Sequence, residues 1–584
     1  MKEARNLAHR FEDDHRAMKW LIWGGSLVSL GFWSNLNDPF NAPKSWILSI
    51  AGFWLLAWVL FQIRERVRIT PLKFATIFAI AYIASLSLAF ISTDNKFIGF
   101  FGEYQRRTGL LSYMALISFF LASSYLFTLH RLGKLEKASL IVGLLTGIYG
   151  FAQHFNLDVV HWKNHYNSVL STLGNPDFAA ALMAIFLILN FGIAFQKRYA
   201  VIARAWAGFN VLLLSVVIYF SHVRQGMLTA FVGVAIILIV RIYQRSKVAG
   251  LSVTSFVTVF GLLAIFGMLD KGPIAKYLYK ESVTLRGDYW RAGWRMFSHH
   301  PLFGVGLDRY GANFRQYRDS TQALRHRGPD FVSNAAHSVP IQLASTGGIF
   351  VLVSFLLFTG FIGFRGITAM RKSQGRDQMS IAVIFAAWIA YELQSLVSID
   401  NLAIAVWGYI LGGAVVGISA ATHQESKSFS EKRSILQPLI SSVLALTLLT
   451  VSALFFGAES SMKSLKSTVL PHSQRDLIRY EKLTQKPLTY VFEEPSFALT
   501  AAEDLFWVNN SSGAISRLKK LINRDPHAYD PQEFLARIYE FEKNWPEALL
   551  IRKRMLKIDP YNPKLLTAIK ADEISGSVPQ PIRQ

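Results

Sequence analysis

The chain has 584 residues, of which 52% are hydrophobic and 14% aromatic, whereas only 17% are charged. Its mean hydropathy is +0.29. Apolar runs of about 18 residues or more, each long enough to cross the hydrocarbon of a bilayer, recur as far as Phe456. This composition excludes an ordinary soluble protein and predicts a polytopic membrane protein.

The formal net charge of +23 would suggest a nucleic-acid partner in a soluble protein. Here the lysines and arginines gather in short loops between the apolar runs, as in membrane proteins, so we expect no nucleic-acid partner. The absence of cysteine excludes disulfides, thiol catalysis and cysteine-based metal sites. The charged N-terminus leads into the first apolar run without a small-residue cleavage site, so we expect no cleavable signal peptide.

The apolar runs predict a bundle of about thirteen transmembrane helices in an all-α fold. We expect them at residues 18–35, 46–63, 72–91, 110–129, 139–155, 177–195, 201–220, 225–240, 251–268, 337–364, 380–398, 402–421 and 434–456. Six basic clusters in the loops then fall on the side of the N-terminus. They are Arg64, Arg66, Arg68 and Lys73; Arg131, Lys134 and Lys137; Lys197, Arg198 and Arg204; Arg241, Arg245 and Lys247; Arg365, Arg371, Lys372 and Arg376; and Lys427, Lys432 and Arg433. The positive-inside rule makes that side the cytoplasm.

This topology predicts a membrane domain at 1–456, with a large extracytoplasmic loop at 269–336, and an extracytoplasmic tail at 457–584. In the tail, Leu521-Ile522-Asn523-Arg524-Asp525-Pro526 recurs as Met555-Leu556-Lys557-Ile558-Asp559-Pro560, an offset of 34 residues. That is the tetratricopeptide period, which predicts a soluble α-helical repeat domain and a possible protein partner. A two-helix cap with a chance match is the alternative.

Five arginines on the predicted outer face are candidates for binding a phosphate or pyrophosphate headgroup. They are Arg106, Arg107, Arg224, Arg286 and Arg291. Positive-inside sorting does not explain arginines there, and the guanidinium fork matches phosphate oxygens. The two glycines of Gly102-Glu103-Tyr104-Gln105-Arg106-Arg107-Thr108-Gly109 would allow close backbone approach. The alternative for any of these arginines is snorkelling to lipid phosphate.

His337 is the candidate catalytic base, because an imidazole can take a proton from a hydroxyl near neutral pH. It stands where the outer loop re-enters the membrane, so a helix-capping role is the alternative. The acidic residues of the outer loop lack metal-ligand spacing, so we expect no metal; they are Asp288, Asp308, Asp319 and Asp330. No phosphate-binding loop for nucleotides occurs, so a donor would have to arrive already activated, and no cofactor is expected.

Two further groups in the large loop are interpreted as structural. Tyr289, Trp290, Trp294 and Phe297 share one helical stripe, which predicts a helix lying in the interface with its aromatic side chains toward the membrane. The remaining arginines are interpreted as solvated or lipid-facing charges. They are Arg295, Arg309, Arg315, Arg318, Arg325 and Arg327.

Several of these residues together give the chain a resemblance to the bacterial O-antigen ligase and polymerase family. The match begins with Arg286 and Trp290, continues through His300-Pro301-Leu302-Phe303-Gly304-Val305-Gly306, and ends with His337 before a helix containing Gly347-Gly348. Upstream, Leu173-Gly174-Asn175-Pro176-Asp177 and Arg224 are similar to family positions. The resemblance covers roughly residues 100–420.

The resemblance implies a GT-C-like glycosyltransferase of the cytoplasmic (inner) membrane that moves a glycan from undecaprenyl pyrophosphate to an acceptor hydroxyl without metal. Arg224 and Arg286 would hold the pyrophosphate, with Arg286 and His337 as the catalytic pair. Ser338 stands where the family often has Asn, and the tail is not part of the ligase core, so lipid, glycan or protein acceptors stay open. A transporter or flippase of an anionic glycolipid, or an envelope scaffold acting through the tail, is the alternative.

Overall fold

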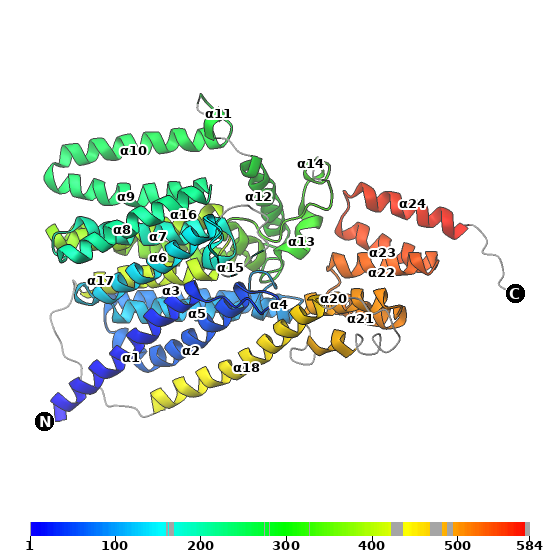
Figure 1. Cartoon of the computed structure of the whole chain (residues 1–584), viewed down its shortest axis with the longest axis horizontal. Coiled ribbons are helices and arrows are strands. Elements are labelled where there is room, and N and C mark those ends of the chain that lie inside the picture. The colour runs from blue at the N-terminus through cyan, green and yellow to red at the C-terminus, as the bar shows by residue number, and fades with distance from the viewer. Residues whose placement is uncertain are drawn as a thin grey trace.

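The computed structural model describes residues 2–158, 160, 162, 169–273, 275–278, 281–325, 328–421, 436–467, 482–487 and 494–577. Within these ranges the secondary structure is entirely helical, without a strand. Long apolar helices lie side by side, and the N-terminus and the tail stand at opposite ends of the bundle (Figure 1). Which end of the bundle faces the cytoplasm stays a prediction. The sixth of the basic clusters on which it rests, at Lys427, Lys432 and Arg433, lies outside the described residues.

Each of the thirteen predicted spans coincides with a helix. Ten are long and apolar enough to cross a membrane: α2 (Asn41–Arg66), α3 (Thr70–Ser92), α6 (Gly133–His154), α7 (Pro176–Phe195), α8 (Val201–Phe220), α9 (Arg224–Arg245), α15 (Val339–Lys372), α16 (Gly375–Val397), α17 (Leu402–Ala421) and α18 (Leu436–Ser467). The other three are α1 (Lys2–Leu30), with a charged first half, α5 (Leu110–Leu126), which has 17 residues, and α10 (Lys247–Met268). The all-α polytopic fold is therefore confirmed.

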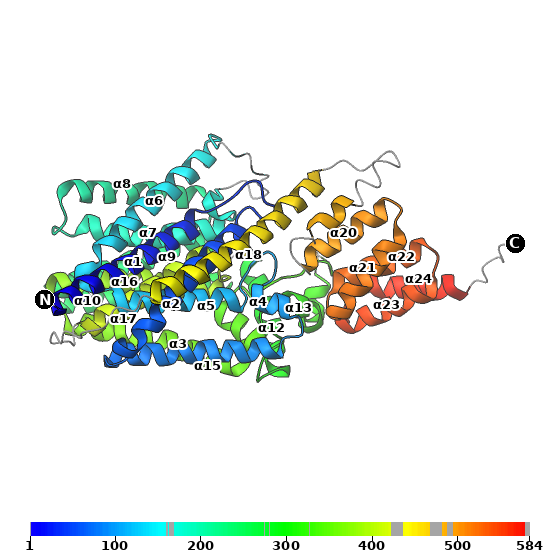
Figure 2. The same ribbon diagram turned by 90° about the horizontal axis from the view of Figure 1, so that it is seen from below.

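The centre of the bundle is α17, which is apolar on every side and buried along its length. A helix without a polar face needs neighbours all round, and α17 packs against α5, α15 and α16. By contrast, α8 and α10 turn many large apolar side chains outward, as lipid-facing helices do. α18 lies along α2 and runs from the bundle to the tail (Figure 2).

The large loop forms a cap of short helices at the tail end of the bundle. It contains α11 (Ala275–Leu278), α12 (Glu281–His299), α13 (Tyr310–Tyr317) and α14 (Ser320–Ala323). Its core contains Tyr289, Ala292, Met296, Tyr310 and Phe314. The predicted aromatic stripe is therefore wrong at one position: Tyr289 is buried in the cap, whereas Trp294 is 62% exposed. The cause is that Tyr289 shares a helix face with Ala292 and Met296, one turn and two turns further along α12.

A backbone contact between the cap and α15 explains two family-like segments, His300–Gly306 and Gly347-Gly348. The amide of Ile349 donates to the carbonyl of Pro301 at 2.8 Å, and the amide of Val305 donates to the carbonyl of Ser345 at 2.9 Å. Gly348 interrupts the helical geometry of α15 with φ +74°, and a Cβ there would lie 2.2 Å from the Leu302 carbonyl oxygen. Glycine is thus required for the approach, which holds the first turns of α15 and the preceding residues in place.

The tail is a row of helices packed against their neighbours in sequence. They are α20 (Pro495–Trp507), α21 (Ser511–Arg524), α22 (Tyr529–Phe541), α23 (Trp545–Ile558) and α24 (Pro563–Ser577). The two repeated aspartates occupy equivalent places: Asp525 follows α21 with φ −138° and ψ 83°, and Asp559 follows α23 with φ −133° and ψ 73°. The domain boundary and the tetratricopeptide assignment stay predictions; α18 runs past the expected boundary, to Ser467.

The tail docks on the cap through buried ion pairs, which corrects the interpretation of three arginines as solvated or lipid-facing. Arg309 pairs with Asp525, while Arg315 and Arg318 pair with Asp559 at 3.1 and 2.7 Å. All three arginines are less than 10% exposed. Their partners lie more than 200 residues further along the chain. Separately, Arg325 pairs with Asp288, Arg295 contacts the Tyr317 carbonyl, and Arg327 lies outside the described residues.

We expect Gly348→Ala to destabilise the protein by about 1–3 kcal/mol, because the new Cβ meets the Leu302 carbonyl and φ is positive. Thermal unfolding of the purified protein in detergent measures the effect. The matched control is Gly360→Ala in the same helix, where a Cβ would meet nothing within 4 Å. Equal unfolding temperatures for the two variants would contradict the close contact.

Candidate functional site

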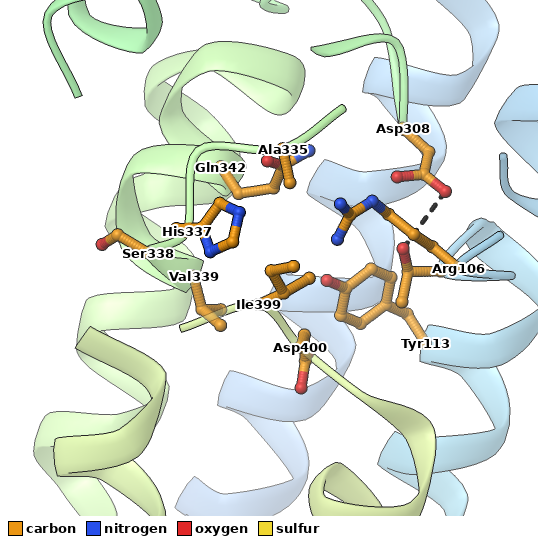
Figure 3. A pocket seen from close by; sticks show the side chains of 11 residues that line it. Arg106, Tyr113, Asp308, Ala335, His337, Ser338, Val339, Gln342, Ile399 and Asp400 are labelled. Carbon is orange, nitrogen blue, oxygen red and sulfur yellow. Dashed lines mark hydrogen bonds between the residues drawn. The ribbon is translucent and has the colours of Figure 1, made fainter. Parts of the chain in front are cut away.

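A small pocket lies at the tail end of the bundle, where the Gly102–Gly109 loop, the start of α15 and the α16–α17 connection meet. Figure 3 shows the guanidinium of Arg106 between the side chains of His337 and Asp308. The pocket is lined by Arg106, Thr108, Tyr113, Asp308, Ala335, His337, Ser338, Val339, Gln342, Ile399 and Asp400. Two sequence candidates, Arg106 and His337, therefore meet in one place although they are far apart in the chain.

His337 is held in an unusual backbone conformation two residues before α15. Its φ is +52°, in the left-handed region that non-glycine residues seldom occupy, so the surrounding structure must fix it there. Its ring lies against Tyr289, with 5.3 Å between ring centroids and 30° between planes. Burial and then the charges of Arg106 and Arg286 lower the pKa of His337 to about 3. The imidazole is thus neutral at physiological pH and a weak base in these surroundings.

The loop that carries Arg106 is closed by its two glycines, as the sequence predicts. A Cβ on Gly102 would lie 2.4 Å from the Thr108 amide nitrogen, and one on Gly109 would lie 2.4 Å from the Gly102 nitrogen. Arg106 donates to the Asn334 side chain, and its Nε is buried without a hydrogen-bond partner among the described residues. Burial is the main cause that lowers the pKa of Arg106. A buried donor without a partner is costly, so this nitrogen is an unmet hydrogen-bond donor beside the pocket.

Asp308 is a pocket residue that the sequence analysis considered only as a metal ligand. It is 8% exposed and accepts hydrogen bonds from the Glu103 amide at 2.7 Å and the Thr108 hydroxyl at 3.1 Å. Burial raises the pKa of Asp308, and burial together with Asp308 raises the pKa of Glu103 to about 7. The sequence offered one signal, since Asp308 stands two residues after the family-like segment His300–Gly306. Its separation in sequence from the other acidic residues argued only against a metal site.

Arg286 projects from α12 toward the start of α9. Its guanidinium donates to Gln225 at 3.4 Å, and Gln225 in turn donates to Gln394 of α16 at 2.5 Å. The Nε of Arg286 is also buried with no partner within the described part of the chain. Burial is the main cause that lowers the pKa of Arg286, partly opposed by Asp177. Arg286 does not line the pocket, but it lies close enough to His337 for its charge to lower the pKa of that imidazole.

Arg224, the first residue of α9, is exposed and directly precedes Gln225. The start of α7, which follows the family-like segment Leu173–Asp177, also lies near Arg286, because the charge of Asp177 acts on that guanidinium. Asn175 caps α7 by accepting from the Asp177 amide at 2.8 Å, after Gly174 turns the chain with φ +73°. Arg224 is therefore the sequence neighbour of the residue that Arg286 contacts.

The remaining two candidates, Arg107 and Arg291, do not line the pocket. Arg107 is 4% exposed and pairs with Glu459 of α18 at 2.9 Å and with Glu494 at 3.4 Å. Arg291 is half exposed and pairs with Asp288 and, at 3.1 Å, with Asp319. Both guanidinium groups are therefore already paired with carboxylates.

A second carboxyl, Asp400, which the sequence analysis did not nominate, lies on the opposite side of the pocket in the α16–α17 connection. Burial raises the pKa of Asp400 to about 7, partly opposed by hydrogen bonds from Tyr391 and Tyr113. As for metals, no group of three or more His, Asp or Glu side chains among the described residues is arranged to hold an ion.

Comparison with known proteins identifies part of the chain. The sequence model of the family described as O-antigen ligase matches residues 209–356. That segment runs from α8 through the cap into α15, and it contains Arg224, Arg286 and His337. A search of curated proteins gave no match.

We expect Arg107→Gln to destabilise the protein by roughly 3–5 kcal/mol, because removal of one partner leaves two buried carboxylates uncompensated. Thermal unfolding in detergent measures the loss. Arg537→Gln is the control, since Arg537 pairs with Glu533 on the surface with 65% of its side chain exposed. A loss of stability no larger than in the control would contradict the buried pairing.

Proposed function

Because residues 209–356 match the sequence model of the O-antigen ligase family, we propose that this chain transfers a glycan from undecaprenyl pyrophosphate to an acceptor hydroxyl. The reaction takes place at the outer face of the cytoplasmic membrane, with the N-terminus inside. The observation that carries this proposal is the neutral His337 near two half-buried guanidinium groups, those of Arg106 and Arg286. A base beside a strongly positive site suits displacement of an anionic leaving group.

The pyrophosphate of the donor binds at Arg224 and Arg286. A guanidinium binds phosphate oxygens through two parallel hydrogen bonds, and it keeps its charge. The buried Nε of Arg286 lacks a partner among the described residues, so an anion there would satisfy this donor. The positive charges supply the compensation that a metal gives in other phosphate sites, so the proposed reaction uses no metal.

In the reaction, the acceptor oxygen attacks the anomeric carbon while the bond from that carbon to the pyrophosphate oxygen breaks. The hydroxyl proton passes to the imidazole of His337, and undecaprenyl pyrophosphate leaves with the bonding electrons, stabilised by Arg286 and Arg224. His337 then returns the proton to solvent. The pocket, which is lined by Gln342, Asp308 and Asp400 besides His337, receives the acceptor.

Donor binding also adjusts the basicity of His337. Burial and then the charges of Arg106 and Arg286 lower the pKa of His337. An anionic pyrophosphate compensates those charges, so the pKa of His337 rises when the donor is bound, and the imidazole becomes a better base. The histidine is thus weakest as a base when no donor is present.

We expect His337→Ala to abolish transfer, so that undecaprenyl-pyrophosphate-linked glycan accumulates as in cells without the protein. Extraction and quantification of the carrier-linked glycan measures this at matched protein abundance. The control, His299→Ala, changes an exposed histidine of the cap and leaves the carrier-linked pool normal. Wild-type behaviour of both variants would refute the catalytic assignment and bring forward the transporter and scaffold readings.

The acid limb of kcat/KM should show no histidine titration between pH 7 and 5, because the pKa of His337 lies near 3. Glu103 and Asp400 titrate near pH 7, so the profile is measured with Glu103→Gln and Asp400→Asn in place. Adding Arg106→Gln removes a nearby positive charge, which raises the pKa of His337 and moves the acid limb to higher pH. A limb near the ordinary histidine value that Arg106→Gln leaves unmoved would contradict this account.

A further inference from the structure

We propose that the C-terminal tail is a positioning element of the pocket, in which Asp525 and Asp559 hold the chain segments that carry Asp308, Arg106 and His337. The proposal rests on the proposed function and adds a role for residues outside the family match. Three segments supply the charged pocket residues: the Gly102–Gly109 loop, the turn at Asp308, and the stretch that leads into His337. Each of them is tied by arginines to acidic residues of α18 or the tail.

The first tie is next to Arg106. Arg107 is buried between Glu459 of α18 and Glu494, the residue that precedes α20. Its guanidinium also lies over the Tyr104 ring, 4.7 Å from the centroid. Arg107 adjoins Arg106 within the loop that Gly102 and Gly109 close. The ion pairs of Arg107 therefore restrain the backbone position of Arg106.

The second tie is next to Asp308. Arg309 pairs with Asp525, and the same carboxylate accepts from the Asn95 side chain at 3.3 Å. Asn95 caps α4 (Lys96–Phe101), the short helix that leads into the Gly102–Gly109 loop. A single carboxylate of the tail thus joins the two segments that bring Asp308 and Arg106 together, and Asp308 itself binds the Glu103 amide across the same junction.

The third tie lies before His337. Arg315 and Arg318 both bind Asp559, and both also donate to the Pro329 carbonyl, at 3.2 and 2.7 Å. Pro329 belongs to the stretch that ends in the strained backbone of His337. Asp559 therefore fixes two arginines in the orientation that holds this stretch.

The 34-residue repeat explains why two aspartates serve the same purpose. Asp525 and Asp559 end equivalent helices with nearly the same backbone angles, and both present a carboxylate to arginines at or beside α13. The repeat thus produces two equivalent anchors on the face of the tail that meets the cap.

A positioning role predicts that loss of an anchor lowers kcat and leaves donor binding unchanged. Arg224 and Arg286 lie on α9 and α12, and Arg286 is held by Gln225 and not by a tail residue, so the donor KM should not depend on the anchors. Transfer requires the base and the reacting atoms within a few tenths of an ångström, and a displacement of about 1 Å costs up to about 100-fold in rate. Loosening the segments that carry Arg106, Asp308 and His337 therefore lowers kcat.

The test uses the full-length protein with Asp525→Asn or Asp559→Asn, which keep the side-chain shape and remove the charge. Purified protein is added to membranes of cells that lack it, which contain both donor and acceptor, and release of undecaprenyl pyrophosphate is followed as donor is varied. We expect kcat to fall roughly 10- to 100-fold with the donor KM unchanged. Arg309→Gln combined with Asp525→Asn replaces the ion pair by a neutral hydrogen-bonding pair, and it should recover part of the loss.

The control is Asp572→Asn. Asp572 is also buried, at 1% exposure, but its partner Arg552 belongs to the tail, so this change weakens the tail without touching an anchor. If Asp572→Asn lowers kcat as much as the anchor variants, or if the anchor variants keep the wild-type kcat, the positioning role is overturned.

Hydrogen exchange provides a readout that does not depend on the reaction. Asp525→Asn should accelerate amide exchange in the Gly102–Gly109 loop, and Asp559→Asn should do so in residues 328–337, while Asp572→Asn leaves both at the wild-type rate. Unchanged exchange in the anchor variants overturns the proposal. If wild-type protein releases no undecaprenyl pyrophosphate but the exchange pattern holds, the proposed function fails and the anchoring stands.

Discussion

The structure depends on how it compensates guanidinium groups buried at the edge of the bundle. A cation removed from water must be paired or it destabilises the fold. In this chain, carboxylates from distant parts of the sequence meet that demand: Glu459 and Glu494 at Arg107, Asp525 at Arg309, and Asp559 at Arg315 and Arg318. The half-buried guanidinium groups of Arg106 and Arg286 donate to neutral Asn and Gln side chains, and their Nε atoms have no partners among the described residues. After burial, the charges of these two arginines are what lowers the pKa of His337, although Asp308 lies near Arg106 and Asp177 near Arg286.

How far the sequence could predict this arrangement depends on the range of each interaction. The helices follow from local apolar runs, and His337, Arg286 and the glycine-pinched loop follow from short motifs in order. The sequence could not distinguish Arg106 from Arg107, because both stand in one polar loop. They diverge because Arg107 has φ +59° and finds Glu459, which is 352 residues away. Asp308 was not placed in the pocket for a similar reason, since backbone contacts with Glu103 rather than a pattern of ligands define its place.

The glycine-rich pieces of the family-like sequence have a mechanical meaning in this structure. Gly304 and Gly348 allow two backbones to approach, so the cap is joined to α15 by peptide hydrogen bonds instead of side chains. Such a joint tolerates little movement, because a shift of either backbone breaks both hydrogen bonds. It lies a few residues beyond His337, and the tail-anchored stretch from Pro329 lies before it. The histidine is thus restrained from both sides, which accounts for a strained φ at a residue other than glycine.

Attachment of the tail by ion pairs suits a pocket that must remain polar. An apolar interface would bury more surface per residue, but it would require large hydrophobic side chains on the very loops that carry Arg106 and Asp308. Arginine meets both needs, because its stem packs in the interface while its fork holds a carboxylate and a carbonyl at once, as Arg318 does with Asp559 and Pro329. The cost is sensitivity: a buried ion pair adds little net stability when intact, yet loss of one partner leaves a charge that nothing nearby can compensate. The geometry of the pocket therefore depends on the charge of side chains that never touch it.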